Sequence, residues 1–207
     1  MEDPDAEIID GSHDAAPFDL SGGHPALDLV NTRDFRFRED GGIELLQSYG
    51  DLLRFMRQAA LLSESEAQLL SNTGKKGRAL RSALELREGL AATFYGALDG
   101  SLPPPAAVRT LQQQFQNAAR HRVLQWRQGR LEWTWEETSA ELPVWILAQA
   151  ASELMTSEAM ARVRACNAET CRWLFLDTSK NRTRRWCNMK VCGNRMKARK
   201  FRAGREE

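Results

Sequence analysis

The chain has 207 residues, a formal net charge of +1 and an apolar fraction of 42%. This length fits one domain with or without a small module, and the composition suffices for a packed core. Residues 162–207 hold 14 Lys and Arg against 4 Asp and Glu, a balance of +10, so residues 1–161 carry −9. A basic terminal segment indicates a polyanionic partner such as nucleic acid, or a tail that docks on the acidic remainder.

The first sixteen residues contain six acidic residues, no Lys or Arg and no apolar run. This pattern is the reverse of a secretory signal, and no stretch approaches the roughly 18 apolar residues of a membrane span. We therefore expect residues 1–16 to be a disordered acidic tail, and the protein to be cytoplasmic with no membrane partner. In a reducing compartment, paired cysteines are more often metal ligands than disulfides.

The segment "FDLSGGHPALDLVNT" (residues 18–32) predicts a turn at Gly22 and Gly23 and a short helix that begins at Pro25. Four polar residues stand in this otherwise apolar motif: His24, Asp28, Asn31 and Thr32. Asp28 and Asn31 would share a helix face and could converge on a small-molecule ligand. We favour the alternative, in which the four residues cap the helix and form buried hydrogen bonds.

Apolar residues then recur at helical spacing up to about residue 160. The pattern predicts helices over residues 43–62, from the capping box of Ser63 and Glu66 to Leu70, over residues 78–98, from about Ala106 to Arg120, and over residues 142–163. The last helix is the most apolar, so we expect it to lie centrally, with an interruption near Thr156.

The segment "RVLQWRQGRLEWTW" (residues 122–135) changes to a period of two, which indicates a β-hairpin with its turn at Gln128 and Gly129. The expected pairs are Arg127 with Arg130, Trp126 with Leu131, and Leu124 with Trp133. One face then carries Leu124, Trp126, Leu131 and Trp133, and we expect it to join the core. A surface on which nucleic-acid bases stack is the less favoured alternative.

All four cysteines of the chain lie in one short stretch, as two C-x4-C pairs separated by fifteen residues: Cys166, Cys171, Cys187 and Cys192. Two chelating pairs suit a tetrahedral zinc ion in a closed structural site. A redox pair would need C-x-x-C, and the ferredoxin spacings of iron–sulfur proteins are absent. We therefore predict one structural zinc ion.

The spacing within the second pair predicts its local geometry. Residues five apart lie about 140° apart on a helix, so Cys187 and Cys192 cannot both face one ion from regular helical turns. We expect Cys187 in a loop and Cys192 near the start of a helix that runs to about Arg202. The segment "RWLFLDTS" supplies strand-forming residues for a hairpin between the pairs. The order of knuckle, hairpin, turn and helix is that of a treble-clef finger.

The C-terminal helix carries more positive charge than four thiolates and one zinc ion require. Arg195, Arg199 and Arg202 fall within roughly 60° on a helical wheel, and Lys197 and Lys200 form a second stripe. Guanidinium groups bind phosphate oxygens in pairs. The predicted nucleic-acid contacts are Arg182, Arg184, Arg185, Arg195, Lys197, Arg199, Lys200 and Arg202.

Two of these motifs resemble known families. "CNAETCRWLFLDTSKNRTRRWCNMKVCGNR", with its tetrapeptide at residues 192–195, resembles the CGNR zinc finger, and "GGHPALDLVNT" resembles the opening motif of the ABATE domain. The resemblance covers nearly the whole chain after the acidic tail, and all four cysteines match the zinc ligands of the finger. It implies a bacterial transcription regulator, in which a ligand- or stress-sensing front domain precedes a DNA-binding finger.

We therefore expect a mainly α fold with three parts: a tail (1–16), a helical domain with one hairpin (17–160), and a treble-clef-like finger (161–207). The expected partner is double-stranded DNA, with a small-molecule effector and a homodimer as further expectations. The leading alternative is an RNA-binding or ribosome-associated zinc protein. An enzyme with an accessory finger is less favoured, because the sequence has no G-x-S-x-G, P-loop or H-E-x-x-H motif.

Overall fold

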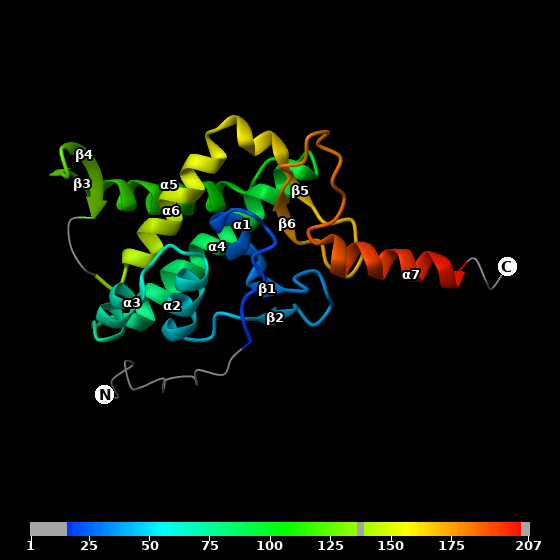
Figure 1. Cartoon of the computed structure of the whole chain (residues 1–207), viewed down its shortest axis with the longest axis horizontal. Coiled ribbons are helices and arrows are strands. Elements are labelled where there is room, and N and C mark those ends of the chain that lie inside the picture. The colour runs from blue at the N-terminus through cyan, green and yellow to red at the C-terminus, as the bar shows by residue number, and fades with distance from the viewer. Residues whose placement is uncertain (1–15, 136–138, 204–207) are drawn as a thin grey trace.

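The computed structural model of the chain describes residues 16–135 and 139–203 (Figure 1). The predicted acidic tail lies outside the described residues except for Ala16. The described part is mainly helical with small hairpins, so the predicted fold class is confirmed. Its α-helices are α1 (Pro25–Asn31), α2 (Tyr49–Gln58), α3 (Glu64–Ser71), α4 (Lys76–Leu98), α5 (Pro105–Arg120), α6 (Leu142–Met155) and α7 (Asn194–Ala203).

The strands of the described part form antiparallel two-stranded ladders. They are β1 (Arg33–Asp34) with β2 (Ile43–Glu44), β3 (Arg122–Arg127) with β4 (Arg130–Trp135), and β5 (Val163–Ala165) with β6 (Leu174–Leu176). A 3₁₀ helix, Glu158–Arg162, follows α6. The helix predicted over residues 142–163 is therefore interrupted where expected, since Thr156 is the C-cap of α6.

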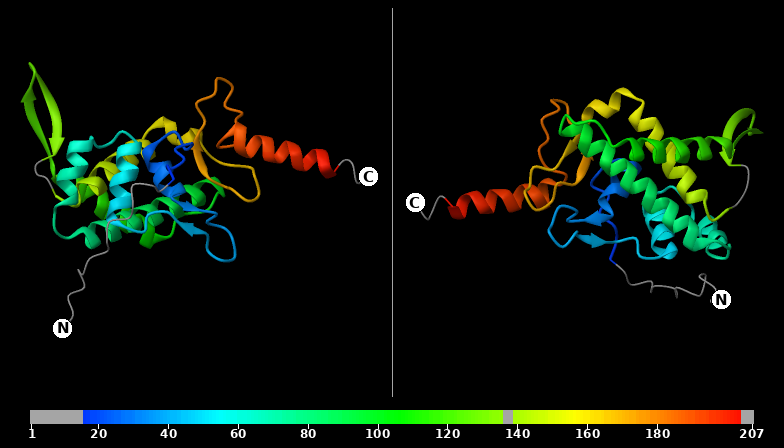
Figure 2. Two further views of the ribbon diagram at one scale, coloured as in Figure 1. Left: turned by 60° about the horizontal axis from the view of Figure 1, so that its bottom comes forward. Right: turned by 180° about the vertical axis from the view of Figure 1, so that it is seen from behind.

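Helix α1 is central to the front domain. It packs against α4 and α6, and α6 packs in turn against α4 and α5. Figures 1 and 2 show that the β3–β4 hairpin projects from one end of this body and that α7 projects from the other. Helix α6, which was predicted to be central because it is the most apolar, thus lies in the middle of this domain.

Capping decides where the helices begin. Ser48 accepts a hydrogen bond from the amide of Asp51, whose carboxylate accepts one from the amide of Ser48, and Ser63 forms the equivalent box with Glu66. The prediction of one helix over residues 43–62 is wrong at its start, because β2 pairs with β1 and helix α2 begins only after Ser48. The other predicted helices begin within about two residues of their expected positions.

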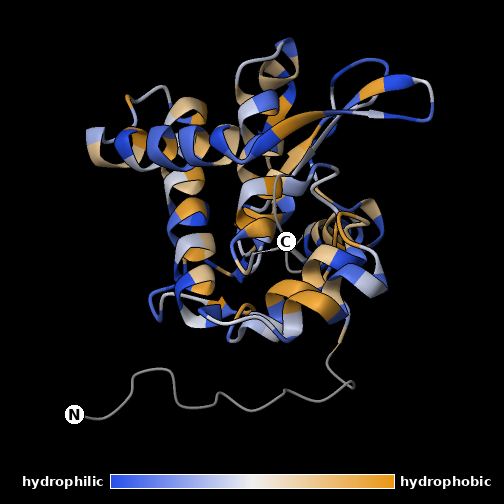
Figure 3. Cartoon of the chain, turned by 90° about the vertical axis from the view of Figure 1, so that its left-hand side faces the viewer, coloured by the Kyte–Doolittle hydropathy of each residue, from blue (hydrophilic) through white to orange (hydrophobic). Residues whose placement is uncertain are grey.

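The front domain is held by one apolar core to which α1, α2, α4 and α6 contribute most. Its largest fully buried apolar side chains include Leu27, Leu29, Leu52, Phe55, Met56, Leu86, Leu90 and Phe94. Figure 3 shows both hydrophobic and hydrophilic residues along the helices seen from the side, as expected for amphipathic helices around a shared core. Val163 of β5 and Leu174 of β6 belong to the same core. The finger therefore contributes to the packing of the front domain.

One arginine, Arg87, is buried in the front domain and is fully paired there. The side chain of Arg87 is 2% exposed and forms two hydrogen bonds of 2.6 Å with the carboxylate of Glu44. It also contacts Glu88 at 2.9 Å and the hydroxyl of Thr32 at 3.2 Å. A buried charge needs such complete pairing. The network ties α4 to β2 and to the end of α1.

The hairpin has the predicted register, with Arg127 opposite Arg130, Trp126 opposite Leu131, and Leu124 opposite Trp133. The expectation that its apolar face joins the core is wrong, because Trp126 and Trp133 are 70% and 60% exposed. Leu124 and Leu131 are exposed as well. The reason is tertiary: the hairpin extends past the ends of α5 and α6, where no described element covers it (Figure 2).

Candidate metal centre and nucleic-acid interface

Two chain segments bring the four cysteines together. Cys166 and Cys171 lie in the connection between β5 and β6, which forms the first knuckle. Cys187 lies in a bend, and Cys192 lies in a π-helical turn, Met189–Gly193, that leads into α7. The predicted loop and helix positions of the second pair are confirmed. The hairpin predicted between the pairs is wrong, because β6 pairs with β5 upstream of the first knuckle.

The sulfur atoms have the spacing of a tetrahedral metal site. All four Sγ atoms lie within 4.8 Å of one another. The Sγ of Cys187 lies 3.7 Å from that of Cys171 and 3.8 Å from that of Cys192. Four bonds of about 2.3 Å in a tetrahedron place sulfur atoms roughly 3.8 Å apart, so the donor set fits zinc in both number and geometry. The four thiols thus form a candidate metal-binding site.

Without a bound ion, the four thiols shift one another's pKa values. Among the protein groups alone, hydrogen bonds from Cys171 and Cys187 lower the pKa of Cys166 to about 2. The bonds with Cys166 raise the pKa of Cys171 and of Cys187. Burial raises the pKa of Cys192, with the charge of Cys166 as a second cause. The protein alone therefore stabilises one thiolate, and a bound dication would stabilise the others.

The loop that precedes Cys187 is fixed by a fully buried carboxylate. Asp177 accepts hydrogen bonds from the amide and hydroxyl of Ser179, at 3.0 and 2.6 Å, and from the amide of Arg184 at 3.0 Å. Burial opposes its charge, but these hydrogen bonds outweigh burial and hold the pKa of Asp177 below its usual value. The guanidinium of Arg184 donates to the carbonyl of Cys187 and lies 4.6 Å from the centre of the Phe175 ring.

The turn that carries Cys192 is capped by Asn188. The side-chain oxygen of Asn188 accepts from the amides two and three residues further along, and its carbonyl accepts from the amide of Cys192 at 2.9 Å. A Cβ atom at Gly193 would lie 2.4 Å from the Sδ of Met189, so any larger residue would displace that exposed side chain. Local hydrogen bonds thus shape the second knuckle, and the side-chain amide of Asn188 also donates to the hydroxyl of Ser21, ahead of α1, at 3.3 Å.

Helix α7 presents its arginines to solvent beside the first knuckle. Arg195, Arg199 and Arg202 are exposed. Arg195 lies 3.4 Å from the hydroxyl of Thr170, and Arg199 forms an exposed ion pair of 2.5 Å with Glu169. The predicted stripe thus runs along the helix, and its first part faces the Cys166–Cys171 knuckle.

The remaining predicted nucleic-acid contacts differ in their surroundings. Arg182, Arg185 and Lys197 are exposed, and the guanidinium of Arg185 lies 5.6 Å from the Trp186 ring. The guanidinium of Arg184 makes its contacts within the finger, with the carbonyl of Cys187 and the ring of Phe175. The side chain of Lys200 lies outside the described part of the chain.

Comparison with known families agrees with this architecture. The family model ABATE, described as "Putative stress-induced transcription regulator", matches residues 23–158. The chain belongs to the ABATE family. A second model, the CGNR zinc finger, matches residues 162–205, which include the four cysteines and α7. A search of curated proteins gives no match. The resemblance to both families is confirmed.

The ABATE domain and the CGNR finger are joined by paired hydrogen bonds. The side-chain amide of Asn31 donates to the carbonyl of Leu174 and its oxygen accepts from the Leu174 amide, each at 2.9 Å. The amide of Leu176 donates to the carbonyl of Gly22 at 2.8 Å. Strand β6 of the finger is therefore bonded to the opening motif of the ABATE domain.

Aromatic residues complete this joint. The indole Nε1 of Trp173 donates to the carboxylate of Asp34 at 2.8 Å, and the hydroxyl of Tyr95 donates to the carbonyl of Arg172 at 2.9 Å. The guanidinium of Arg172 lies 5.0 Å from the centre of the Phe37 ring. No sequence motif marks these residues, because their roles depend on contacts between segments far apart in the chain.

The polar residues of the opening motif are accounted for by the fold. The Nδ1 of His24 accepts from the amide of Ala26 as an N-cap, and Thr32 donates to the carbonyl of Leu29. Asp28 accepts from the amide of Gly22 at 2.7 Å, which fixes the turn that reaches β6. These contacts favour the structural interpretation of His24, Asp28, Asn31 and Thr32 over a ligand site.

Asp28 also has a strongly raised pKa. Burial raises the pKa of its carboxyl to about 7, with the nearby Asp19 as a further cause, although the amide of Gly22 acts in the opposite direction. The raised pKa brings the titration of this carboxyl close to neutral pH, beside the joint with the finger.

Within residues 16–135 and 139–203, no helix has both the length and the apolarity to cross a membrane.

Proposed function

We propose that the chain is a transcription regulator that binds double-stranded DNA through its CGNR finger, around one structural zinc ion. The observation that carries this proposal is the tetrahedral spacing of four thiols directly beside an exposed basic helix. Zinc, when bound to Cys166, Cys171, Cys187 and Cys192, supplies the cross-link that a module with so small a core needs. Four thiolates leave no open position on such an ion, which supports a binding role over a catalytic one.

The surroundings of α7 support phosphate binding. The ion pair of Arg199 with Glu169 is more than 60% exposed on both sides, and such pairs contribute about 0–1 kcal/mol, so a phosphate can replace it. Helix α7 points away from the ABATE domain (Figures 1 and 2), and among the described residues its ion pair lies within the finger. These observations favour nucleic acid over docking of the helix on the acidic part of the chain.

The salt dependence of DNA binding tests this proposal. The slope of log K against log salt changes by about −0.9 for each phosphate neutralised on duplex DNA. Replacing Arg195, Arg199 and Arg202 together with Gln should flatten the slope by roughly 2–3 and weaken binding to all sequences, with metal content unchanged. A change at one arginine that also relaxes sequence preference would identify a base contact.

A matched control removes the same charge elsewhere. Arg109, Arg127 and Arg130 are exposed residues of α5 and the β3–β4 hairpin, and their joint change to Gln should leave the slope as it is. If this control flattens the slope while the α7 variant does not, the ABATE domain and its exposed tryptophans bind the nucleic acid instead. The assignment to the finger would then be wrong.

The choice between DNA and RNA is tested with the same protein. A basic zinc scaffold can bind either backbone, so duplex DNA and a structured RNA are compared at equal salt. Tighter binding to the RNA would favour the RNA-binding or ribosome-associated alternative. A homodimer stays a prediction, which the mass of the protein in solution checks.

A further inference from the structure

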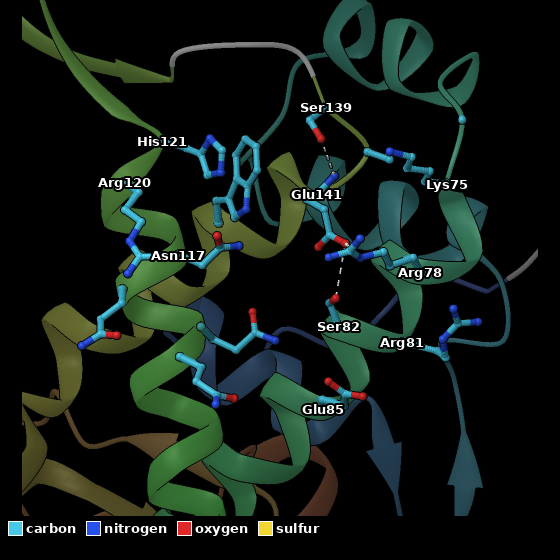
Figure 4. Close-up of a pocket in the computed structure, with 16 residues that line it drawn as sticks. Lys75, Arg78, Arg81, Ser82, Glu85, Asn117, Arg120, His121, Ser139 and Glu141 are labelled. Atoms are coloured by element: carbon cyan, nitrogen blue, oxygen red, sulfur yellow. Dashed lines mark hydrogen bonds and ion pairs between the residues drawn. The ribbon is translucent and has the colours of Figure 1, made fainter.

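The ABATE domain contains a polar cavity of about 750 Å³ at the end of the bundle that carries the β3–β4 hairpin (Figure 4). This volume is typical of sites for small organic molecules. Its lining comes from the first turns of α4, the second half of α5 and the segment that enters α6. The charged side chains of the lining are Lys75, Arg78, Arg81, Arg120, Glu85 and Glu141.

One wall of the cavity is the start of a long helix whose amides lack a side-chain cap. Helix α4 has 23 residues, its N-cap is Lys75 in the left-handed conformation with φ of 63°, and no side chain caps it. Its first turn contains no acidic residue. Gly74 and Lys75 both line the cavity, so the positive end of the helix dipole is next to it. Such a helix start suits a phosphate group.

The basic side chains stand on both walls. Figure 4 shows Lys75, Arg78 and Arg81 on the α4 side and Arg120 across from them on α5. Among the described residues Lys75, Arg81 and Arg120 form no ion pair, and Arg78 lies 3.6 Å from the carboxylate of Glu141. The positive charge beside the start of α4 is therefore only partly neutralised.

The opposite wall can bind hydroxyl groups. Side-chain amides of Gln113, Gln114, Gln116 and Asn117 line it from α5. Glu85 of α4 and Glu141 at the entry to α6 add acceptors, and Glu141 itself accepts from the hydroxyl of Ser82 at 3.3 Å. Amides and carboxylates together are the donors and acceptors that a polyhydroxylated molecule needs.

A buried donor at the cavity has no partner. Trp145 lines the cavity and is 3% exposed, and its ring is stacked on that of His121 with centroids 3.8 Å apart. Its Nε1 atom makes no hydrogen bond among the described residues. The Nε1 atom itself is closed to solvent, so Trp145 offers the cavity the surface of its ring and not its N–H.

We propose that this cavity binds a sugar phosphate, free or as part of a nucleotide, with the phosphate beside the basic side chains at the start of α4 and hydroxyls against the side-chain amides of α5. The role of this ligand as the effector of a regulator rests on the function proposed above, but its binding does not. The site is separate from His24, Asp28, Asn31 and Thr32, whose polar groups are bonded within the fold.

Titration calorimetry on the full metal-loaded chain, without DNA, tests this proposal. Glucose 6-phosphate is compared with glucose, adenosine monophosphate with adenosine, and both with inorganic phosphate. We expect one or both phosphorylated compounds to bind at least roughly tenfold more tightly than their unphosphorylated partners, since ionic hydrogen bonds to phosphate are lost in the latter. Equal binding within each pair, or equally tight binding of inorganic phosphate, would overturn it.

Two variants locate the ligand. Arg81→Gln should raise the dissociation constant about tenfold, and the matched change Arg109→Gln, also on an exposed arginine but outside the cavity, should not. Arg120→Gln, on the α5 wall, should weaken binding as well. Equal effects of Arg81→Gln and Arg109→Gln would place the ligand elsewhere. The α7 triple variant should bind the ligand normally, so failure of DNA binding is distinguished from failure here.

Discussion

The ABATE domain buries the apolar faces of several helices in one continuous core, whereas the CGNR finger buries a small group of residues around its thiols. That group consists of Cys166, Ala168, Phe175, Cys187 and Cys192. Three of these five are cysteines, so residues of the metal site make up most of the buried core of the finger. Stability that the ABATE domain draws from apolar area must come in the finger from its metal ligands.

The two regions are nevertheless not independent. Val163 and Leu174 place the β5–β6 hairpin in the core of the ABATE domain, and Asn31 bonds both backbone groups of Leu174. The first knuckle is therefore anchored to the ABATE domain, while α7 projects away from that domain. The β5–β6 hairpin thus belongs to the larger core even though its turn carries two metal ligands.

The largest expected effect comes from removing a metal ligand. Cys187→Ser should abolish metal binding, which in sites of this kind supplies on the order of 10–16 kcal/mol of apparent binding free energy. The finger should then become sensitive to protease, while the ABATE domain keeps its helical circular dichroism. Elemental analysis and limited proteolysis check this, with Thr178→Ala in the same finger as the control. A folded, protease-resistant finger without metal would contradict it.

A smaller effect is expected at the joint. Asn31→Ala leaves the buried N–H and C=O of Leu174 without partners, at a cost of about 1–3 kcal/mol for each. The free energy of unfolding should fall with metal content unchanged, because no ligand is touched. Asn72→Ala at the exposed end of α3 is the control for loss of an asparagine. An unchanged stability would show that the two regions are independent after all.

The pH dependence of stability sharpens the description of the joint. The pKa of Asp28 is raised to about 7 in the folded chain, so the folded state binds a proton more tightly than the unfolded state does. This contribution is complete below the unfolded pKa of about 4 and is lost as pH rises toward 7 and above. The free energy of unfolding of Asp28→Asn, relative to that of the wild type, should therefore rise by roughly 2 kcal/mol between pH 5 and pH 8.

Chemical unfolding of wild type and Asp28→Asn at both pH values measures this difference. Thiol titration affects both proteins alike and cancels in the comparison. A difference that stays constant with pH would show that Asp28 is ionised in the folded protein throughout this range.

The smallest effect is expected at the hairpin. Leu131 is 57% exposed, so Leu131→Ser should change the free energy of unfolding by less than about 0.5 kcal/mol. Leu90, which is fully buried in α4, is the matched control, since Leu90→Ala should cost about 2–5 kcal/mol. Similar losses at both positions would mean that the hairpin is covered in solution, for example by a second copy of the chain.

Much of this architecture could be predicted from local patterns. The capping box of Ser63 and Glu66 placed α3, the period of two and the Gln128-Gly129 turn placed β3 and β4 in register, and the paired cysteines identified the metal site. Each of these features depends on residues close together in the chain. The start of α2 was missed because the competing β1–β2 pair joins segments about ten residues apart.

Most of the helices, the β3–β4 hairpin and the donor set follow from the sequence alone, because backbone capping, strand alternation and thiol chelation act over a few residues. Only the tertiary structure decided that the tryptophan face of the hairpin is exposed, since nothing local tells which face another element will cover. It also decided that Asp28 and Asn31 serve the joint with β6, across 143 residues in the case of Asn31. The cavity beside α4 also depends on the tertiary structure, because its walls come from helices that meet only after packing.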